Sequence, residues 1–228
     1  MKLGWIAPLL GLALASCAKF PSGGSGASGK RLTFTMTVNR EINPNYVYIF
    51  ALRPTNDVNP TDQGPIPVIG PPWGNGFVAG NCSYFVRWDP LQSPKYQIYK
   101  FQDVNLTQYF SIGSPVNYVD VQPGGRTLQF DIDLSQIANS IPDAQAYQSL
   151  QVNLLTMDRV PQGGSGGSKV WDALGDSQSA TEINTWVTIP LNVASLYNNQ
   201  RFNNLEPSGD CPDPDLDIID WSINVNLQ

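Results

Sequence analysis

The sequence predicts an all-β fold: an antiparallel β-sandwich, jelly-roll or immunoglobulin-like, of about nine or ten strands with long loops. Apolar and polar residues alternate over Leu32–Val38 and again over Leu128–Leu134, the period of strands with one buried face. Glycines that favour turns separate such segments, as at Gly124-Gly125. Helical signal is confined to Ser135–Ile137 and Asp143–Leu150, both shorter than the ~10–12 residues expected of a helix.

The individual strands follow from these patterns in chain order. Leu32–Val38 alternates apolar residues with threonines, whereas Tyr46–Leu52 is apolar on both faces, which predicts a central strand. Ile219–Leu227 again alternates, with Asp, Ser and Asn on its polar face. The other predicted strands are Phe77–Ala79, Cys82–Trp88, Tyr96–Phe101, Tyr109–Ile112, Tyr118–Val121, Leu128–Leu134, Leu150–Met157 and Trp186–Ile189.

Two long irregular segments interrupt the strands. Arg53–Gly76 contains six prolines, and proline lacks the donor that a β-ladder needs, so the segment is predicted to be a loop. Trp73 lies in this loop among prolines and glycines, where it either caps the sandwich or anchors a binding partner. Pro161–Ser168 is a Gly/Ser run, interpreted as a mobile loop within one domain.

The N-terminus has the features of an export signal. Lys2 precedes an apolar segment, Leu3–Leu14, that is too short to span a bilayer and leads through small residues to Cys17. The run Leu14-Ala15-Ser16-Cys17 resembles the lipobox of bacterial lipoproteins. In that family cleavage falls before the cysteine, which then carries the lipid. The alternative is an ordinary signal peptide that happens to contain a cysteine.

The lipoprotein resemblance implies three regions along the chain. Its expected regions are a signal peptide over 1–16, the lipidated cysteine with a flexible Gly/Ser tether over 17–30, and one β-sandwich domain over 31–228. Ala18 follows the cysteine, which by the same resemblance favours the outer membrane or the cell surface over the inner membrane.

Composition narrows the function classes. The formal net charge is −6, which argues against nucleic-acid binding because phosphate contacts need clustered Lys and Arg. The chain has no histidine, which removes Ser-His-Asp and Cys-His catalysis and histidine metal ligands. Carboxylate chemistry stays open. Asp131 and Asp133 share one strand face about 7 Å apart, a spacing that suits a glycosidase pair but also any strand with acids on its polar face.

Cys82 and Cys211 remain once Cys17 is assigned to lipid. Two cysteines in an oxidising compartment usually pair, so a disulfide between them is predicted, with two buried thiols as the alternative.

The densest acidic segment of the chain precedes the last strand. Asp213, Asp215 and Asp217 alternate with other residues, as carboxylates do in calcium loops, and Asp210 lies just before them. The segment lacks the glycine turn and the distal Glu of an EF-hand, and a solvated acidic loop is the simpler interpretation. Apart from calcium at this segment, no cofactor is expected.

Several aromatic residues are candidates for a binding surface. Trp73, Trp88, Tyr96 and Tyr99 could form an array on which sugar rings stack, although aromatic residues more often fill the core.

One passage of the chain carries a second resemblance. The segments Tyr96–Tyr99, Leu128–Ser135 and Leu150–Asp158 together resemble DOMON-like and family-9-like carbohydrate-binding sandwiches in their strand order. The resemblance implies the sandwich fold, while the absence of histidine excludes the usual heme-ligand pair of that group.

These observations favour a lipid-anchored, extracytoplasmic bacterial envelope protein with a non-catalytic binding or structural role. The alternative is a carbohydrate-binding module or a carboxylate-based glycoside hydrolase. The expected partners are the membrane, reached through the lipid, and either an envelope protein or a glycan, with no nucleic acid.

Overall fold

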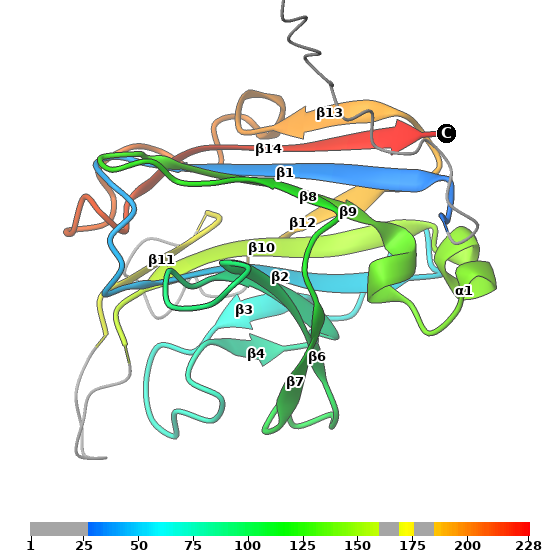
Figure 1. The fold of residues 1–228 in the computed structure, drawn as a ribbon, viewed down its shortest axis with the longest axis horizontal. Coiled ribbons are helices and arrows are strands. Elements are labelled where there is room, and N and C mark those ends of the chain that lie inside the picture. Colours follow the sequence, from blue (N-terminus) through cyan, green and yellow to red (C-terminus); the bar gives the residue numbers. More distant parts are fainter. Residues whose placement is uncertain (1–26, 160–168, 176–184) are drawn as a thin grey trace, which may run out of the picture.

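The computed structural model describes residues 27–159, 169–175 and 185–228 and consists of two antiparallel β-sheets packed face to face (Figure 1). The all-β sandwich expected from the sequence is therefore confirmed. The described residues form fourteen strands, more than the nine or ten expected. Eleven of them overlap the individual segments predicted above, and the other three, Pro65–Pro67, Trp171–Ala173 and Ser195–Asn198, are too short to show an alternating pattern.

The smaller sheet has five strands. Their spatial order is β13 (Ser195–Asn198), β14 (Ile218–Leu227), β1 (Lys30–Val38), β9 (Thr127–Asp133) and β8 (Asn117–Val119). β1 lies in the middle and pairs with β14 and β9, so the first and last strands of the domain are hydrogen-bonded neighbours.

The larger sheet has seven strands. Its order is β11 (Trp171–Ala173), β10 (Ser149–Met157), β2 (Val47–Thr55), β5 (Tyr84–Trp88), β6 (Tyr96–Phe101) and β7 (Tyr109–Gly113), with β12 (Val187–Pro190) also paired to β10. The short helices are η1 (Leu134–Ile137), α1 (Ile141–Ala146) and η2 (Gln200–Phe202). Ser140 caps α1 by accepting a hydrogen bond from the Asp143 amide.

The main core lies between the two sheets. Phe130 of β9 is at its centre, where its ring stacks on Phe34 of β1 at 5.2 Å and meets Phe50 of β2 edge-on at 4.7 Å. Tyr96 of β6 completes this cluster, 5.8 Å from Phe130. Because aromatic rings bury large areas and prefer these geometries, the cluster joins both sheets.

A second apolar layer covers the outer face of the seven-stranded sheet. It contains Ile49, Phe85, Leu155 and Trp171 from that sheet. The cover includes β3 (Pro65–Pro67) and β4 (Val78–Gly80), which pair with each other below β10 and β2 (Figure 1). The Pro-rich segment predicted to be a loop thus contains a strand and part of a buried layer, because a two-stranded pairing tolerates proline at its edge.

The domain also begins earlier than expected. Ser28, assigned to the tether, is 4% exposed, and its amide donates to the Asp133 carboxylate at 2.9 Å. Asp133 in addition caps η1, accepting from the Ser135 amide at 2.9 Å. The predicted signal peptide over 1–16, Cys17 and the Gly/Ser run Pro161–Ser168, which was predicted to be a loop, lie outside the described residues.

The predicted disulfide is wrong, since no bond joins Cys82 and Cys211. The Cys82 thiol donates to the carbonyls of Leu52 and Tyr84, between β2 and β5, and the Cys211 thiol donates to the carbonyl of Trp171 on β11. Two to three strand spacings separate these places, about 10–14 Å, beyond the ~7 Å that a disulfide spans between Cα atoms. Burial raises the pKa of both thiols to about 12.

We expect Phe130→Ala to lower the free energy of unfolding by about 3–5 kcal/mol, because it empties the centre of the inter-sheet core. Val193→Ala is the control, since Val193 is 54% exposed and should change stability little. Urea unfolding followed by tryptophan fluorescence measures both, and equal midpoints for the two variants would contradict this account of the core.

Candidate functional site

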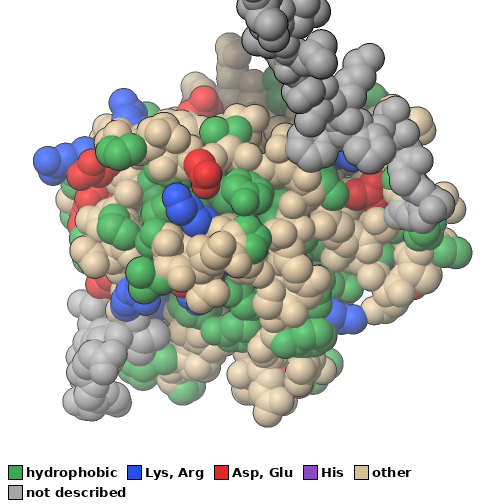
Figure 2. Space-filling model, in the orientation of Figure 1, with side chains coloured by type: hydrophobic (Ala, Val, Ile, Leu, Met, Phe, Trp, Pro, Cys, Tyr) green, Lys and Arg blue, Asp and Glu red, His purple; other side chains and the backbone are tan. Residues whose placement is uncertain are grey.

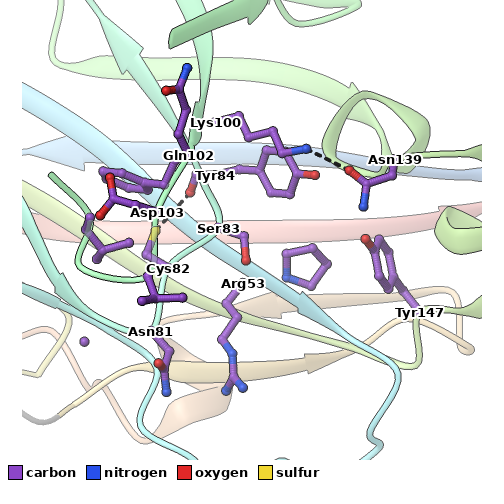
Figure 3. Close-up of a pocket in the computed structure, with 15 residues that line it drawn as sticks. Arg53, Asn81, Cys82, Ser83, Tyr84, Lys100, Gln102, Asp103, Asn139 and Tyr147 are labelled. Atoms are coloured by element: carbon purple, nitrogen blue, oxygen red, sulfur yellow. Dashed lines mark hydrogen bonds between the residues drawn. The ribbon is translucent and has the colours of Figure 1, made fainter. Parts of the chain in front are cut away.

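A cleft of about 400 Å³ opens at the end of the sandwich near α1 (Figure 3). It is lined mainly by polar side chains from neighbouring strands of the seven-stranded sheet and from the segment around α1. The lining includes Arg53, Ser83, Tyr84, Lys100, Asn139 and Tyr147.

Strand pairing brings these residues together. β5 lies between β2 and β6, with Tyr84 opposite Leu52 on one side and opposite Lys100 on the other. Arg53 therefore comes from one neighbouring strand and Lys100 from the other. Asn139 lies just before the cap of α1 and extends toward Lys100, as the dashed line in Figure 3 shows.

Two cationic side chains, Lys100 and Arg53, line the cleft. The Lys100 ammonium donates to Asn139 Oδ1 at 2.7 Å and lies 5.8 Å from the centre of the Tyr84 ring. The Arg53 guanidinium donates to Gln151 at 2.6 Å and pairs with Asp62 at 2.8 Å, so it is held in place.

Asp103 is the one acid among the described lining residues. Its carboxylate accepts hydrogen bonds from the amides of Thr107 and Gln108, and the Thr107 bond is the main reason that its pKa is lowered. The carboxylate thus stabilises the loop that runs from Asp103 to Gln108. The described lining therefore offers no pair of carboxyl groups for glycoside hydrolysis.

Asp131 and Asp133 lie in different surroundings. Asp131 accepts from Asn117 at 3.3 Å on the five-stranded sheet, whereas Asp133 is 5% exposed and surrounded by donors. Burial opposes ionisation of Asp133, but hydrogen bonds from Ser135 and Ser28 outweigh it and lower the pKa. Asp133 is an ionised cap that fixes the start of the domain.

The four aromatic candidates do not share a surface. Trp88 and Tyr96 are 6% and 0% exposed and lie in the core between the sheets. Tyr99 lies on the opposite face of the seven-stranded sheet, stacked on Phe85 at 4.8 Å. The prediction of one aromatic binding surface is therefore wrong, because neighbouring residues of a strand point to opposite faces.

Trp73 is partly buried and contacts the cover of the seven-stranded sheet. The Lys169 ammonium lies 5.4 Å from the centre of its ring. Lys169 itself is 4% exposed and donates to the carbonyls of Val68 and Gly76, the second bond being very short. Lys169 thus holds the Pro-rich segment against the seven-stranded sheet through these two carbonyls, and the Trp73 ring packs near the same ammonium.

The acidic segment before β14 splits into two groups. Asp213 accepts from the Tyr46 hydroxyl at 2.5 Å, and Asp215 accepts from the Asn43 amide at 3.0 Å. Both therefore fix the connection between β1 and β2. Asp217 is fully buried and accepts from the Gly209 amide and from Asn39.

Asp210 instead joins two acids from distant parts of the chain. The two acids are Asp172 of β11 and Glu206, which lies between η2 and β14. One carboxylate oxygen from each of the three residues lies within 4.8 Å of the other two. Among the described residues this is the one group of three possible metal ligands of this kind. We call Asp172, Glu206 and Asp210 the acid cluster.

The acid cluster is strongly perturbed. Burial raises the pKa of Asp172 to about 9, and the charges of Asp210 and Asp217 add to this effect. Burial and the charge of Asp172 raise the pKa of Glu206 to about 10, and burial raises that of Asp210 to about 6. Three carboxylates this close repel one another, so the cluster favours bound protons or a bound cation.

Sequence reasoning found Asp210 but missed Asp172 and Glu206. Asp172 lies in Trp171–Ala173, too short to show alternation, and Glu206 stands alone in a polar segment. No sequence spacing links residues that meet only through sheet pairing and loop closure.

No family model matches the chain, and none of the curated proteins or solved structures matches it either. Within the described part of the chain, no helix is both long and apolar enough to span a bilayer. Among the described side chains on the face shown in Figure 2, Lys and Arg are scattered and form no continuous basic patch.

Lys169 gives the stability of the domain a specific pH dependence. Burial lowers its pKa from 10.5 to about 8, although the charge of Asp158 opposes the shift. The folded state therefore binds fewer protons than the unfolded state between these values, so the contribution of Lys169 to stability rises with pH over that interval.

We expect the free energy of unfolding of the wild type, relative to Lys169→Met, to increase from pH 8 to pH 10. Urea titrations of both proteins at several pH values measure the difference. A constant or falling difference would contradict the burial of this ammonium.

Proposed function

We propose that this protein is a lipid-anchored, extracytoplasmic component of a bacterial cell envelope with a non-catalytic binding role, and that the cleft near α1 is its binding surface. The observation that carries the proposal is the Lys100 ammonium, which lies in this polar cleft and is hydrogen-bonded to the neutral side chain of Asn139. Because Arg53 is paired with Asp62, Lys100 is the cation of the cleft that can attract an anionic group of a ligand.

The chemistry of the lining supports a glycan as the ligand. Ser83 and Asn139 supply hydroxyl and amide groups, and the partly exposed Tyr147 adds an aromatic ring. Binding sites for polar small molecules combine a few convergent polar groups with aromatic surface in a concave setting. Glycans that carry carboxylate or phosphate groups would also pair with Lys100.

Two features support binding over turnover. The described lining has one acid, Asp103, whose oxygens are used by its own loop. The chain has no histidine to act as a general base. A carbohydrate-binding role is therefore favoured over a glycoside hydrolase.

The lipid anchor is supported by the lipobox-like run ending at Cys17 and by the glycines and serines that follow it. Ser28 is the first buried residue of the described chain, 11 positions after Cys17 (28 − 17). A flexible segment of this length spans on the order of 20 Å on average. The domain would stay close to the outer membrane or the cell surface and keep its orientation free.

Glycan binding is tested with full-length protein in detergent on an array of neutral and acidic oligosaccharides. We expect Lys100→Ala to weaken binding at least about tenfold, since it removes a charged hydrogen bond from the cleft. Lys95→Ala is the matched control, because the Lys95 side chain is 40% exposed and pairs with Asp120 at 3.7 Å, and neither residue lines the cleft. Absence of binding to every glycan, or equal loss in both variants, would reject the cleft.

Lipidation is tested separately by metabolic labelling with a palmitate analogue in a bacterial host. The wild type should be labelled and recovered with membranes, whereas Cys17→Ala should be unlabelled, because the thiol is the acceptor of the lipid. An N-terminus that mass spectrometry shows to be unmodified and not cysteine would contradict the anchor.

A further inference from the structure

The acid cluster contains acceptor atoms that the protein does not satisfy. Glu206 is 1% exposed; its Oε2 accepts from the Gly175 amide at 3.0 Å, while its Oε1 is buried without a hydrogen-bond partner. Asp210 Oδ1 is likewise buried and unsatisfied. Buried polar atoms without partners are rare and costly, and both of these belong to residues of the acid cluster, so together they indicate a missing ligand.

The other groups around this point are already fixed. Asp172 accepts from the amides of Ala173 and Ile218, at 3.0 and 2.7 Å, which leaves each oxygen a further lone pair. The main chain at Glu206 is held by Asn199, which donates to its carbonyl at 2.7 Å and accepts from its amide at 2.8 Å. The carboxylates are therefore positioned before any ligand arrives.

We propose that Asp172, Glu206 and Asp210 form a calcium-binding site that fastens the segment before β14 to β11. The site is separate from the cleft and does not depend on the glycan-binding role. It also differs from the calcium loop expected from the sequence, of which it retains Asp210 alone.

Ligand type and spacing favour calcium. The site offers oxygen ligands, which hard divalent cations prefer. The three ligand oxygens lie within 4.8 Å of one another, a separation that two bonds of about 2.4 Å from one calcium ion can span. Calcium also accepts irregular coordination, whereas magnesium demands near-ideal octahedral geometry, which carboxylates from three separate segments would have to meet.

Charge and access fit as well. A Ca²⁺ ion among the three carboxylates would replace their mutual repulsion by attraction and offset two of their three negative charges. The charge of Asp217 also acts on all three, but its carboxylate is held by the Gly209 amide and by Asn39. Asp210 is only partly buried, which leaves a side open for entry of the ion and for the waters that complete its coordination. A bound ion would join β11 of one sheet to the segment that enters β14 of the other.

The site is tested on full-length protein in detergent, first stripped with EDTA. Calcium should raise the melting temperature in a saturable way, and magnesium at the same concentration should raise it less. Terbium provides a direct probe, because Trp171, 4% exposed and adjacent to Asp172, should sensitise its luminescence from this position. Calcium should then displace terbium from the site and lower the sensitised luminescence.

Two variants locate the ion. Glu206→Gln keeps the shape and hydrogen-bond acceptor of the side chain but removes its charge, and should weaken calcium binding at least about tenfold. Asp210→Asn, at the more open side, should do the same if Glu206→Gln fails to fold. Asp220→Asn is the matched control: Asp220 is an exposed acid in the same part of the chain, outside the acid cluster, and its removal should leave calcium binding unchanged.

Three results would overturn the proposal. The first is no melting shift and no sensitised terbium luminescence at millimolar ion. The second is wild-type calcium affinity in both Glu206→Gln and Asp210→Asn. Equal affinity for magnesium and calcium would overturn the choice of ion.

Discussion

The burial of the seven-stranded sheet on both faces is the constraint from which the rest of the structure follows. All nine residues of β10 are buried, and so are the first six of β2. One face packs on the five-stranded sheet. The other is covered by the Pro-rich segment, in which β3 and β4 form a small two-stranded sheet. The sandwich therefore has three layers, and β10 and most of β2 in the middle layer are buried on both faces, whereas β7 at its edge is largely exposed.

Polar side chains on β10 fasten that cover. Asn153 donates to the carbonyls of Pro65 and Thr185 and accepts from the Leu174 amide, and Gln151 donates to the Asp62 carbonyl. Each bond satisfies a main-chain group that a loop lying on a sheet would otherwise bury unpaired. These amides lie within Leu150–Met157, which the sequence predicts to be a strand and which the structure shows as β10. Their polarity inside an apolar strand was the signal that something irregular packs on its outer face.

How far the sequence predicts this molecule depends on the range of the interactions. Alternation over Leu128–Leu134 and Ile219–Leu227 is local, so those strands and the fold class were predictable. The predictions of a disulfide and of one aromatic surface were wrong because both depend on the three-dimensional positions of the residues. The cysteines lie two to three strands apart, and Tyr96 and Tyr99 face opposite sides of the seven-stranded sheet. Of the acid cluster, the sequence indicates Asp210 alone, because it belongs to an acidic run. Asp172 and Glu206 are brought to it by the tertiary structure.

The acid cluster lies where β11, at the edge of the seven-stranded sheet, meets the segment that leads into β14. Asp172 accepts from the Ile218 amide and the Thr156 hydroxyl donates to the Leu216 carbonyl, so polar contacts act beside the buried apolar side chains of Trp171, Leu216 and Ile218 at this edge. Apolar residues would close the edge at lower cost, because buried charges lose hydration that neighbouring carboxylates cannot restore. Carboxylates in such a place stabilise the fold only when a cation or protons neutralise them. The closure of the two sheets at this edge therefore depends on what the acid cluster binds.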